Sequence, residues 1–149
     1  MTSSDCLARF RENDRFLILT HARPDGDTLG SGAALCSALR RAGKAAFLYP
    51  NPQIGAQFAD LTAPYLASAD FVPGFVVAVD TADARLLAEG WTGAVQLCID
   101  HHPSNTGYAA ETLLEAGCAC CGEIVLALIE RLHGVPTPEE AALLYVALA

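Results

Sequence analysis

The fold is decided by the stretch Thr20-His21-Ala22-Arg23-Pro24-Asp25-Gly26-Asp27. The apolar run 16–19 leads into this stretch, and small and apolar residues dominate the run 29–39 that follows it. This order predicts a buried strand, a tight turn and a helix, the first unit of a parallel sheet. Ligands of such sheets bind outside the carboxyl ends of the strands. The imidazole and the two carboxylates of this turn are therefore candidate ligands for a divalent cation.

The same alternation of strand and helix continues along the chain. Apolar runs predict strands at 15–20, 44–49, 75–80 and 94–100. Helical spacing predicts helices at 4–13, 28–42, 82–88 and 120–132. Strands that alternate with helices predict an α/β fold, a parallel sheet with right-handed crossovers.

The remaining segments are predicted from their caps and turn residues. Either Ser4 or Asp5 is expected to cap the first helix, and Thr137 is expected to cap a last helix that begins at Pro138. Segment 53–67 is expected to form a short helix and then a loop, and segment 103–116 a loop with an edge strand.

Composition narrows the class of protein. The 149 residues fit one domain, and 52% hydrophobic against 17% charged residues is a globular composition. The net charge of −8 argues against binding to long duplex nucleic acid, which depends on Lys and Arg contacts with phosphates. No apolar run is long enough to span a membrane, and residues 1–15 have no signal-peptide core. We therefore expect a cytoplasmic protein without a membrane partner.

The cysteines favour a structural role. In a cytosolic chain the six of them are expected to be reduced, with Cys36 and Cys98 in the core. Three more are crowded together, at Cys118, Cys120 and Cys121, but neither a second Cys pair nor a nearby His pair accompanies them. A zinc site is therefore unsupported, and we interpret these three as small residues at a helix start.

Acidic and imidazole side chains follow two more predicted strands. Asp80 ends the strand 75–80, and the triplet Asp100-His101-His102 ends the strand 94–100. Neighbouring parallel strands lie roughly 4.8 Å apart, so groups at their carboxyl ends can converge. A set of imidazoles and carboxylates suits Mn²⁺ better than Ca²⁺. Asp80, alone on its strand, is the candidate for a carboxylate that bridges two ions and so supports phosphoryl displacement.

These stretches resemble the first three motifs of the DHH phosphoesterase superfamily, in its RecJ-like, NrnA-type branch. The matching stretches are His21-Ala22-Arg23-Pro24-Asp25-Gly26-Asp27, Val79-Asp80-Thr81-Ala82-Asp83 and Ile99-Asp100-His101-His102-Pro103. The resemblance implies a three-layer, Rossmann-like domain that hydrolyses short oligonucleotides or 3′-phosphoadenosine 5′-phosphate. It also implies two Mn²⁺ ions, with Mg²⁺ or Co²⁺ as alternatives, and is compatible with a homodimer.

The resemblance further implies a role for each motif residue. The expected metal ligands are His21 and Asp25 for the first ion, Asp27 and His101 for the second, and Asp80 for both. His102 is expected to contact the scissile phosphate and Asp100 to orient its neighbours, which makes them the candidate catalytic residues. Backbone N–H groups of Gly30 and Ser31 are expected to help bind phosphate.

The chain also departs from the family pattern. The family has a fourth motif with a further metal-binding Asp, and a second, substrate-binding domain, and residues 1–149 contain neither. The apolar end, 141–149, resembles a helix that is cut before its packing partner. We therefore expect an incomplete catalytic domain, truncated at its C-terminus, that holds one Mn²⁺ tightly and one weakly.

Other functions stay open at this point. The same chemistry could act on polyphosphate or pyrophosphate, or the chain could be an inactive metal-binding or interaction module. Structural roles are expected for His133 at a helix end and for Trp91 in a loop. For Arg23 and Arg85 the sequence leaves two interpretations open, contact with phosphate or a solvated surface position.

Overall fold

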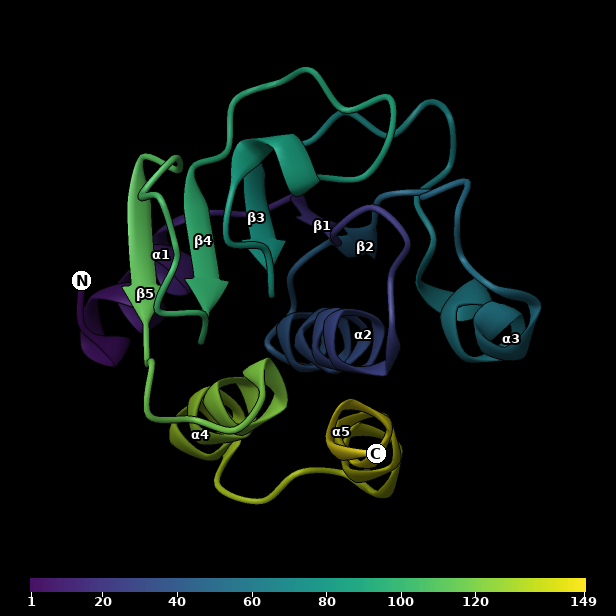
Figure 1. Ribbon diagram of the computed structural model, residues 1–149. Coiled ribbons are helices and arrows are strands. Elements are labelled where there is room, and N and C mark those ends of the chain that lie inside the picture. Colours follow the sequence, from purple (N-terminus) through teal and green to yellow (C-terminus); the bar gives the residue numbers. More distant parts are fainter.

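Five parallel strands form one sheet in the computed structural model, which describes residues 1–149 (Figure 1). The strands are β1 (Phe16–Leu19), β2 (Ala46–Leu48), β3 (Phe75–Val79), β4 (Leu97–Asp100) and β5 (Glu111–Leu114). Their order across the sheet is β2-β1-β3-β4-β5, so that β1, β3 and β4 are neighbours in its centre. All four pairings are parallel, which confirms the predicted α/β fold.

Five α-helices accompany the sheet. They are α1 (Ser3–Glu12), α2 (Gly26–Arg41), α3 (Ala59–Thr62), α4 (Cys121–His133) and α5 (Pro138–Leu148), with short 3₁₀ turns at Ala56–Phe58, Ala63–Tyr65 and Ala84–Leu86. No helix here is both apolar enough and long enough to traverse a lipid bilayer.

The prediction of a helix at 82–88 is wrong, because this segment contains only the 3₁₀ turn Ala84–Leu86. The backbone at the end of that turn and just after it is bound to the stretch that follows β1. The N–H of Ala22 donates to the carbonyl of Leu86, and the N–H of Ala88 donates to the carbonyl of Thr20. These bonds hold the segment extended as an antiparallel bridge, and a helix could not make them.

One of the two predicted helix caps is wrong, and the other is confirmed. Thr2 caps α1 and forms a capping box with Asp5, so neither Ser4 nor Asp5 is the cap. Asp25 caps α2, which begins two residues earlier than predicted, at Gly26. Thr137 caps α5, as expected from its sequence. Because Asp25 is the N-cap residue, it is held at the N-terminus of α2, beside the ends of the strands.

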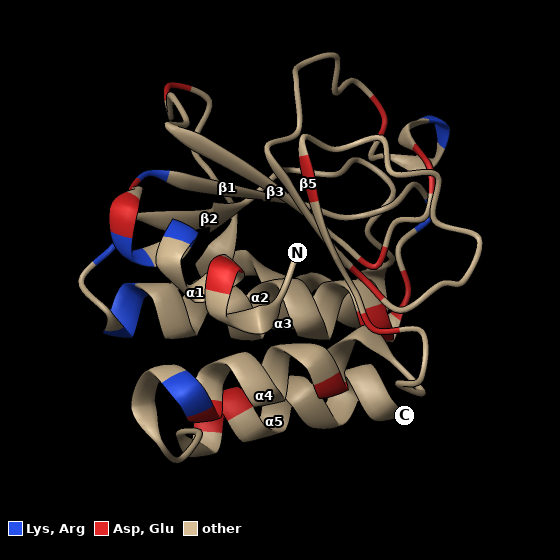
Figure 2. Cartoon of the chain, turned by 90° about the vertical axis from the view of Figure 1, so that its left-hand side faces the viewer, with Lys and Arg blue, Asp and Glu red and all other residues tan.

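The two faces of the sheet are covered differently. Figure 2 shows the helices gathered below the sheet and loops above it. The main core lies on the helical side, where strand residues such as Phe16, Ile18 and Val77 contact α1, α2 and α4. On the other face Leu17, Leu19 and their neighbours are covered by loop residues that include Trp91. The three layers are thus helices, sheet and loops.

Glycines allow α5 to pack closely against the start of α2. A Cβ atom on Gly30 would lie 2.5 Å from the carbonyl oxygen of Leu143 and 2.8 Å from the N atom of Ala147. A Cβ on Gly26 would lie 2.6 Å from the carbonyl oxygen of Val146. Only glycine fits at such contacts between two backbones. The first turns of α2, which carry part of the candidate site, are therefore fixed from the side opposite the sheet.

Candidate metal centre

The residues that follow β1, β3 and β4 meet at the carboxyl edge of the sheet. β3 is hydrogen bonded to β1 on one side and to β4 on the other, so the three strand ends lie side by side. The first contribution comes from His21. Its Nε2 atom lies 3.5 Å from Oδ1 of Asp25 and 3.7 Å from Oδ2 of Asp80. This places the ligand atom of the imidazole between two carboxylates from different elements.

The ring of His21 is oriented by its other nitrogen. Nδ1 lies 2.8 Å from the carbonyl oxygen of Ala22, a contact that requires the proton on Nδ1 and leaves the lone pair on Nε2. The backbone is held in turn by the amide of Asn51, which donates to the carbonyl of His21 and to the hydroxyl of Thr20. The neutral tautomer that this arrangement favours is the one that binds a metal ion.

Asp80 lies at the centre of the site with few protein partners. Its side chain is 4% exposed, its backbone is in the left-handed region at φ 54°, and its buried Oδ1 atom has no hydrogen-bond partner. Burial, together with the nearby carboxylates of Asp27, Asp25 and Asp100, raises the pKa of Asp80 to about 8. A buried carboxylate oxygen without a donor is costly unless a cation binds it. The residue therefore fits the bridging role predicted for it.

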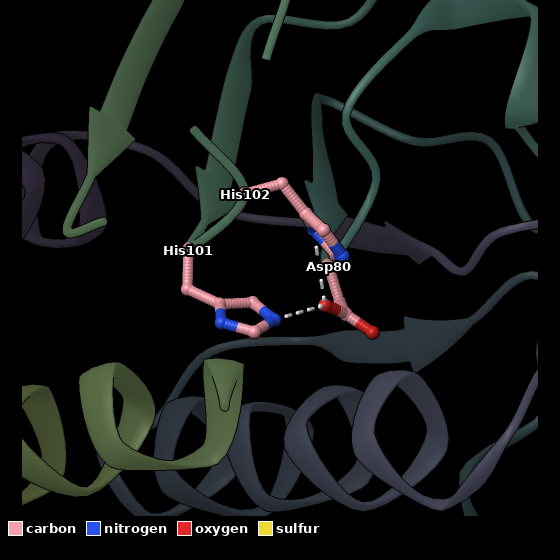
Figure 3. A group of neighbouring side chains, drawn as sticks. All are labelled: Asp80, His101 and His102. Atoms are coloured by element: carbon pink, nitrogen blue, oxygen red, sulfur yellow. Dashed lines mark ion pairs between the residues drawn. The ribbon is translucent and has the colours of Figure 1, made fainter. Parts of the chain in front are cut away.

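His101 approaches Asp80 from the β4 side (Figure 3). Its Nε2 atom lies 3.4 Å from Oδ1 of Asp80 and 3.6 Å from Oδ2 of Asp27. Its Nδ1 atom lies 3.1 Å from the carbonyl oxygen of Cys118, which accepts the Nδ1 proton. As in His21, a backbone carbonyl fixes the tautomer and directs the free lone pair into the acidic cluster.

Asp100 holds the backbone and the ring of the following histidines. This fully buried carboxylate accepts from Nδ1 of His102 at 2.7 Å, from the N–H of His101 at 2.8 Å and from the amide of Asn105 at 2.7 Å. The side chain of His102 is 42% exposed, and its Nδ1 is engaged by Asp100. The arrangement agrees with the orienting role predicted for Asp100, and it leaves Nε2 of His102 free for a substrate.

Asp27 has a structural role in addition to its proximity to the imidazoles. Its Oδ2 accepts the N–H of Cys121 at 2.9 Å, and its Oδ1 accepts the N–H of Gly122 at 3.1 Å. Cys120, the residue at the N-cap of α4, makes no side-chain cap bond, so Asp27 caps α4 from α2. The hydroxyl of Ser31 also donates to Oδ1 of Asp27. A carboxylate has about four lone-pair sites, so roughly one remains for a metal ion.

Two groups of potential ligand atoms share one residue. The first contains His21, Asp25 and Asp80, and the second contains Asp80, His101 and His102; within each group the ligand atoms lie within 4.8 Å of one another. Asp27 lies outside both groups, although its carboxylate is close to His101. A pair of ligand groups that share one buried carboxylate is the arrangement that a two-ion site requires.

The cluster opens into a cavity of about 510 Å³. Most of its lining is polar, and the residues are His21, Ala22, Arg23, Asp25, Asp27, Asp80, Ala82, Leu86, His101, His102 and Ser104. Gly30 and Ser31 are absent from this lining. Both are buried in the second turn of α2, where Gly30 contacts α5 and Ser31 contacts Asp27, so the expectation that they bind phosphate is wrong.

Sequence reasoning missed the groups that orient the ligands. Asn51 and Asn105 come from loops, and the Cys118 carbonyl belongs to the main chain, so neither a period nor a spacing pattern marks them. Structural roles are confirmed for His133, which contacts the Ala38 carbonyl, and for Trp91, whose ring packs on Tyr49. All six cysteines are free, and Cys36 and Cys98 are buried as predicted.

Comparisons with known proteins identify the family and the fold of the chain. The model of the DHH family, N-terminal domain, matches residues 15–148. The bifunctional oligoribonuclease and PAP phosphatase NrnA of Thermus thermophilus is 31% identical over 128 residues, which are 84% of this chain and 39% of that relative. The crystal structure of an exopolyphosphatase-related protein from Bacteroides fragilis has a TM-score of 0.80 at 19% identity, over 97% of this chain and 48% of that one. The chain thus spans about two fifths of its curated relative and about half of its structural neighbour.

Proposed function

The chain belongs to the DHH family, and we propose that its metal centre hydrolyses phosphate esters of short oligonucleotides or of 3′-phosphoadenosine 5′-phosphate. One observation carries the proposal: two groups of ligand atoms share the buried carboxylate of Asp80. The name of the Thermus thermophilus relative supports the choice of substrates. Catalysis of phosphoryl displacement by paired ions needs a shared ligand of this kind.

The residues divide between two ions, for which Mn²⁺ is our first choice and Mg²⁺ and Co²⁺ are alternatives. His21 and Asp25 would hold the first ion and His101 the second, with Asp80 common to both. His102, the remaining member of the second group, would face the substrate instead, because its Nδ1 is bonded to Asp100. Asp27 would complete the second set through the oxygen nearest His101. When bound, the ions would lower the pKa of a water molecule and stabilise charge on the phosphate.

His102 and Asp100 supply the proton chemistry. Asp100 accepts the Nδ1 proton of His102 and so fixes the ring, which lines the cavity next to the ligand groups. His102 would then donate a hydrogen bond to the scissile phosphate and deliver a proton to the leaving oxygen. Because Asp100 is fully buried and bonded to Asn105, it would orient the imidazole without itself contacting substrate.

The test is hydrolysis by the purified chain with Mn²⁺ on a short oligoribonucleotide, 3′-phosphoadenosine 5′-phosphate and polyphosphate. We expect turnover of the first two substrates, and we expect Asp80→Ala to abolish it. The matched control is Asp60→Ala, which removes an exposed carboxylate on α3 that makes no hydrogen bond or ion pair. The function would be contradicted if the Asp80 and Asp60 variants hydrolysed these substrates equally well.

The same assay separates the alternatives. Turnover of polyphosphate alone would favour an exopolyphosphatase-like hydrolase, in line with the name of the Bacteroides fragilis neighbour, whose likeness itself concerns the fold. If the folded chain bound Mn²⁺ through Asp80 but turned over none of the three, it would be a metal-binding module. That result would overturn the hydrolase proposal and leave the metal centre in place.

A further inference from the structure

We propose that Arg23 binds a second phosphate group of the substrate, so that the site prefers esters with two phosphates over esters with one. This inference rests on the phosphoesterase function proposed above. Arg23 is the one Lys or Arg among the cavity residues, which otherwise include three carboxylates. Figure 2 shows most of the basic residues at the left of the view, away from the acidic residues gathered where the strands end.

The guanidinium of Arg23 has no partner within the chain. It makes no hydrogen bond, no ion pair and no cation–π contact, and the residue is exposed. Arg85 is the informative comparison, because its guanidinium donates to both carboxylate oxygens of Asp83 and it lies outside the cavity lining. A guanidinium is suited to bidentate binding of phosphate. That capacity is unused in Arg23 and satisfied in Arg85.

The backbone presents Arg23 in a costly conformation. Its φ is 51°, in the left-handed region that side chains other than those of Gly, Asn and Asp rarely adopt. Pro24 restricts the residue before it further, and the N–H of Arg23 is held by Oε1 of Gln53 at 2.8 Å. Glycine would adopt this conformation without strain. The turn therefore does not itself require arginine, and the side chain projects from a fixed point on the cavity wall.

The strand order separates Arg23 from the position of the scissile phosphate. Arg23 follows β1 and His102 follows β4, and β3 with Asp80 lies between them. At roughly 4.8 Å per strand spacing, the two walls are about 10 Å apart. The scissile phosphate would therefore lie near the ends of β3 and β4, beside Asp80 and His102. Arg23 would lie next to the part of the substrate that extends over the end of β1. A second phosphate there would meet the one free cation of the cavity.

The experiment compares two substrates that differ in one phosphate, 3′-phosphoadenosine 5′-phosphate and adenosine 3′-monophosphate. With Mn²⁺, we expect Arg23→Gln to lower kcat/KM for the bisphosphate by 10- to 100-fold and for the monophosphate by less than 3-fold. Arg23→Lys keeps the charge and should recover most of the loss. Arg85→Gln is the matched control and should change neither value, since that guanidinium is already paired with Asp83.

Binding gives a second readout that does not need turnover. With Ca²⁺ in place of Mn²⁺, calorimetry should show a Kd for the bisphosphate that is at least 10-fold weaker in Arg23→Gln, with the Kd for the monophosphate unchanged. If the wild-type chain hydrolyses both nucleotides but Arg23→Gln affects both equally, or neither, the proposed role of Arg23 is wrong. The proposed phosphoesterase function would survive that result. Failure of the wild-type chain to hydrolyse either nucleotide would instead contradict the proposed function.

Discussion

Asp80 is a carboxylic acid whose surroundings favour its neutral form. Its pKa is raised to about 8, against an ordinary value of 3.8, by burial and by the carboxylates of Asp27, Asp25 and Asp100. A metal ion must bind the ionised form, so below pH 8 it has to displace a proton. The raised pKa thus couples metal affinity to pH.

We expect the affinity for Mn²⁺ to rise with pH up to about 8 and then to level off. Below this value the affinity should fall by up to about tenfold per pH unit, because one proton is displaced from Asp80. Calorimetric titration at several pH values measures the slope. An affinity that was independent of pH between 6 and 8 would show that the pKa of Asp80 is not raised.

Asp27 is both the cap of α4 and a candidate metal ligand. Its removal should therefore lower the stability of the fold as well as the affinity for metal. Asp27→Ala leaves the N–H groups of Cys121 and Gly122 without their acceptors, and should lower the free energy of unfolding by about 0.5–2 kcal/mol. Asp80→Asn removes a ligand without removing a cap, and should not destabilise the metal-free chain. Urea denaturation compares the two. Equal stabilities would argue against a capping role for Asp27.

His102 should affect turnover far more than metal binding. Its Nδ1 is bonded to Asp100, so we expect its Nε2 to contact the substrate and not a metal ion. His102→Ala should lower kcat by about 10²- to 10⁴-fold, the range for loss of a general acid. The Kd for Mn²⁺, measured in the same protein, should change by less than 3-fold. A large loss of Mn²⁺ affinity would make His102 a ligand instead.

At the level of elements, α2 is held between the sheet and α5. Gly30→Ala should lower the free energy of unfolding by about 1–3 kcal/mol, because its Cβ would lie 2.5 Å from the Leu143 carbonyl oxygen. The matched control is Gly117→Ala, where an added Cβ meets no atom within 4 Å and the effect should stay within about 1 kcal/mol. Thermal unfolding of both variants measures the difference. A Gly30 variant as stable as the control would mean that α5 does not pack closely against α2 at Gly30.

The sequence was informative about elements where a local pattern decides them. The apolar runs that become β1, β3 and β4 end next to acidic or imidazole residues, so both the sheet and the metal ligands could be predicted. The structure of segment 82–88 could not be predicted in this way. Its backbone bonds to Ala22 and Thr20, which are distant in sequence, and these bonds replace those of a helix. For the same reason Asn51 and Asn105 carried no signal, since their role depends on which loops meet.

On the scale of the whole molecule, the site joins elements that are distant in sequence. Its ligands come from the ends of three strands and the first turn of α2, and the groups that orient them come from loops and from the start of α4. Part of the net charge of −8 is concentrated there, and divalent cations would reverse the local sign. Metal ions bound to this cluster should therefore stabilise the entire fold.

The most direct test of a metal centre built around Asp80 is a Mn²⁺ titration followed by electron paramagnetic resonance, at a pH above the Asp80 pKa of about 8. We predict two ions per chain that share a ligand, seen as an exchange-coupled spectrum. The second ion should be weaker, because the helix cap occupies most of Asp27. Asp80→Ala should eliminate the coupled signal. Uncoupled or absent Mn²⁺ in the wild-type chain, or the same coupled signal in the variant, would contradict the account.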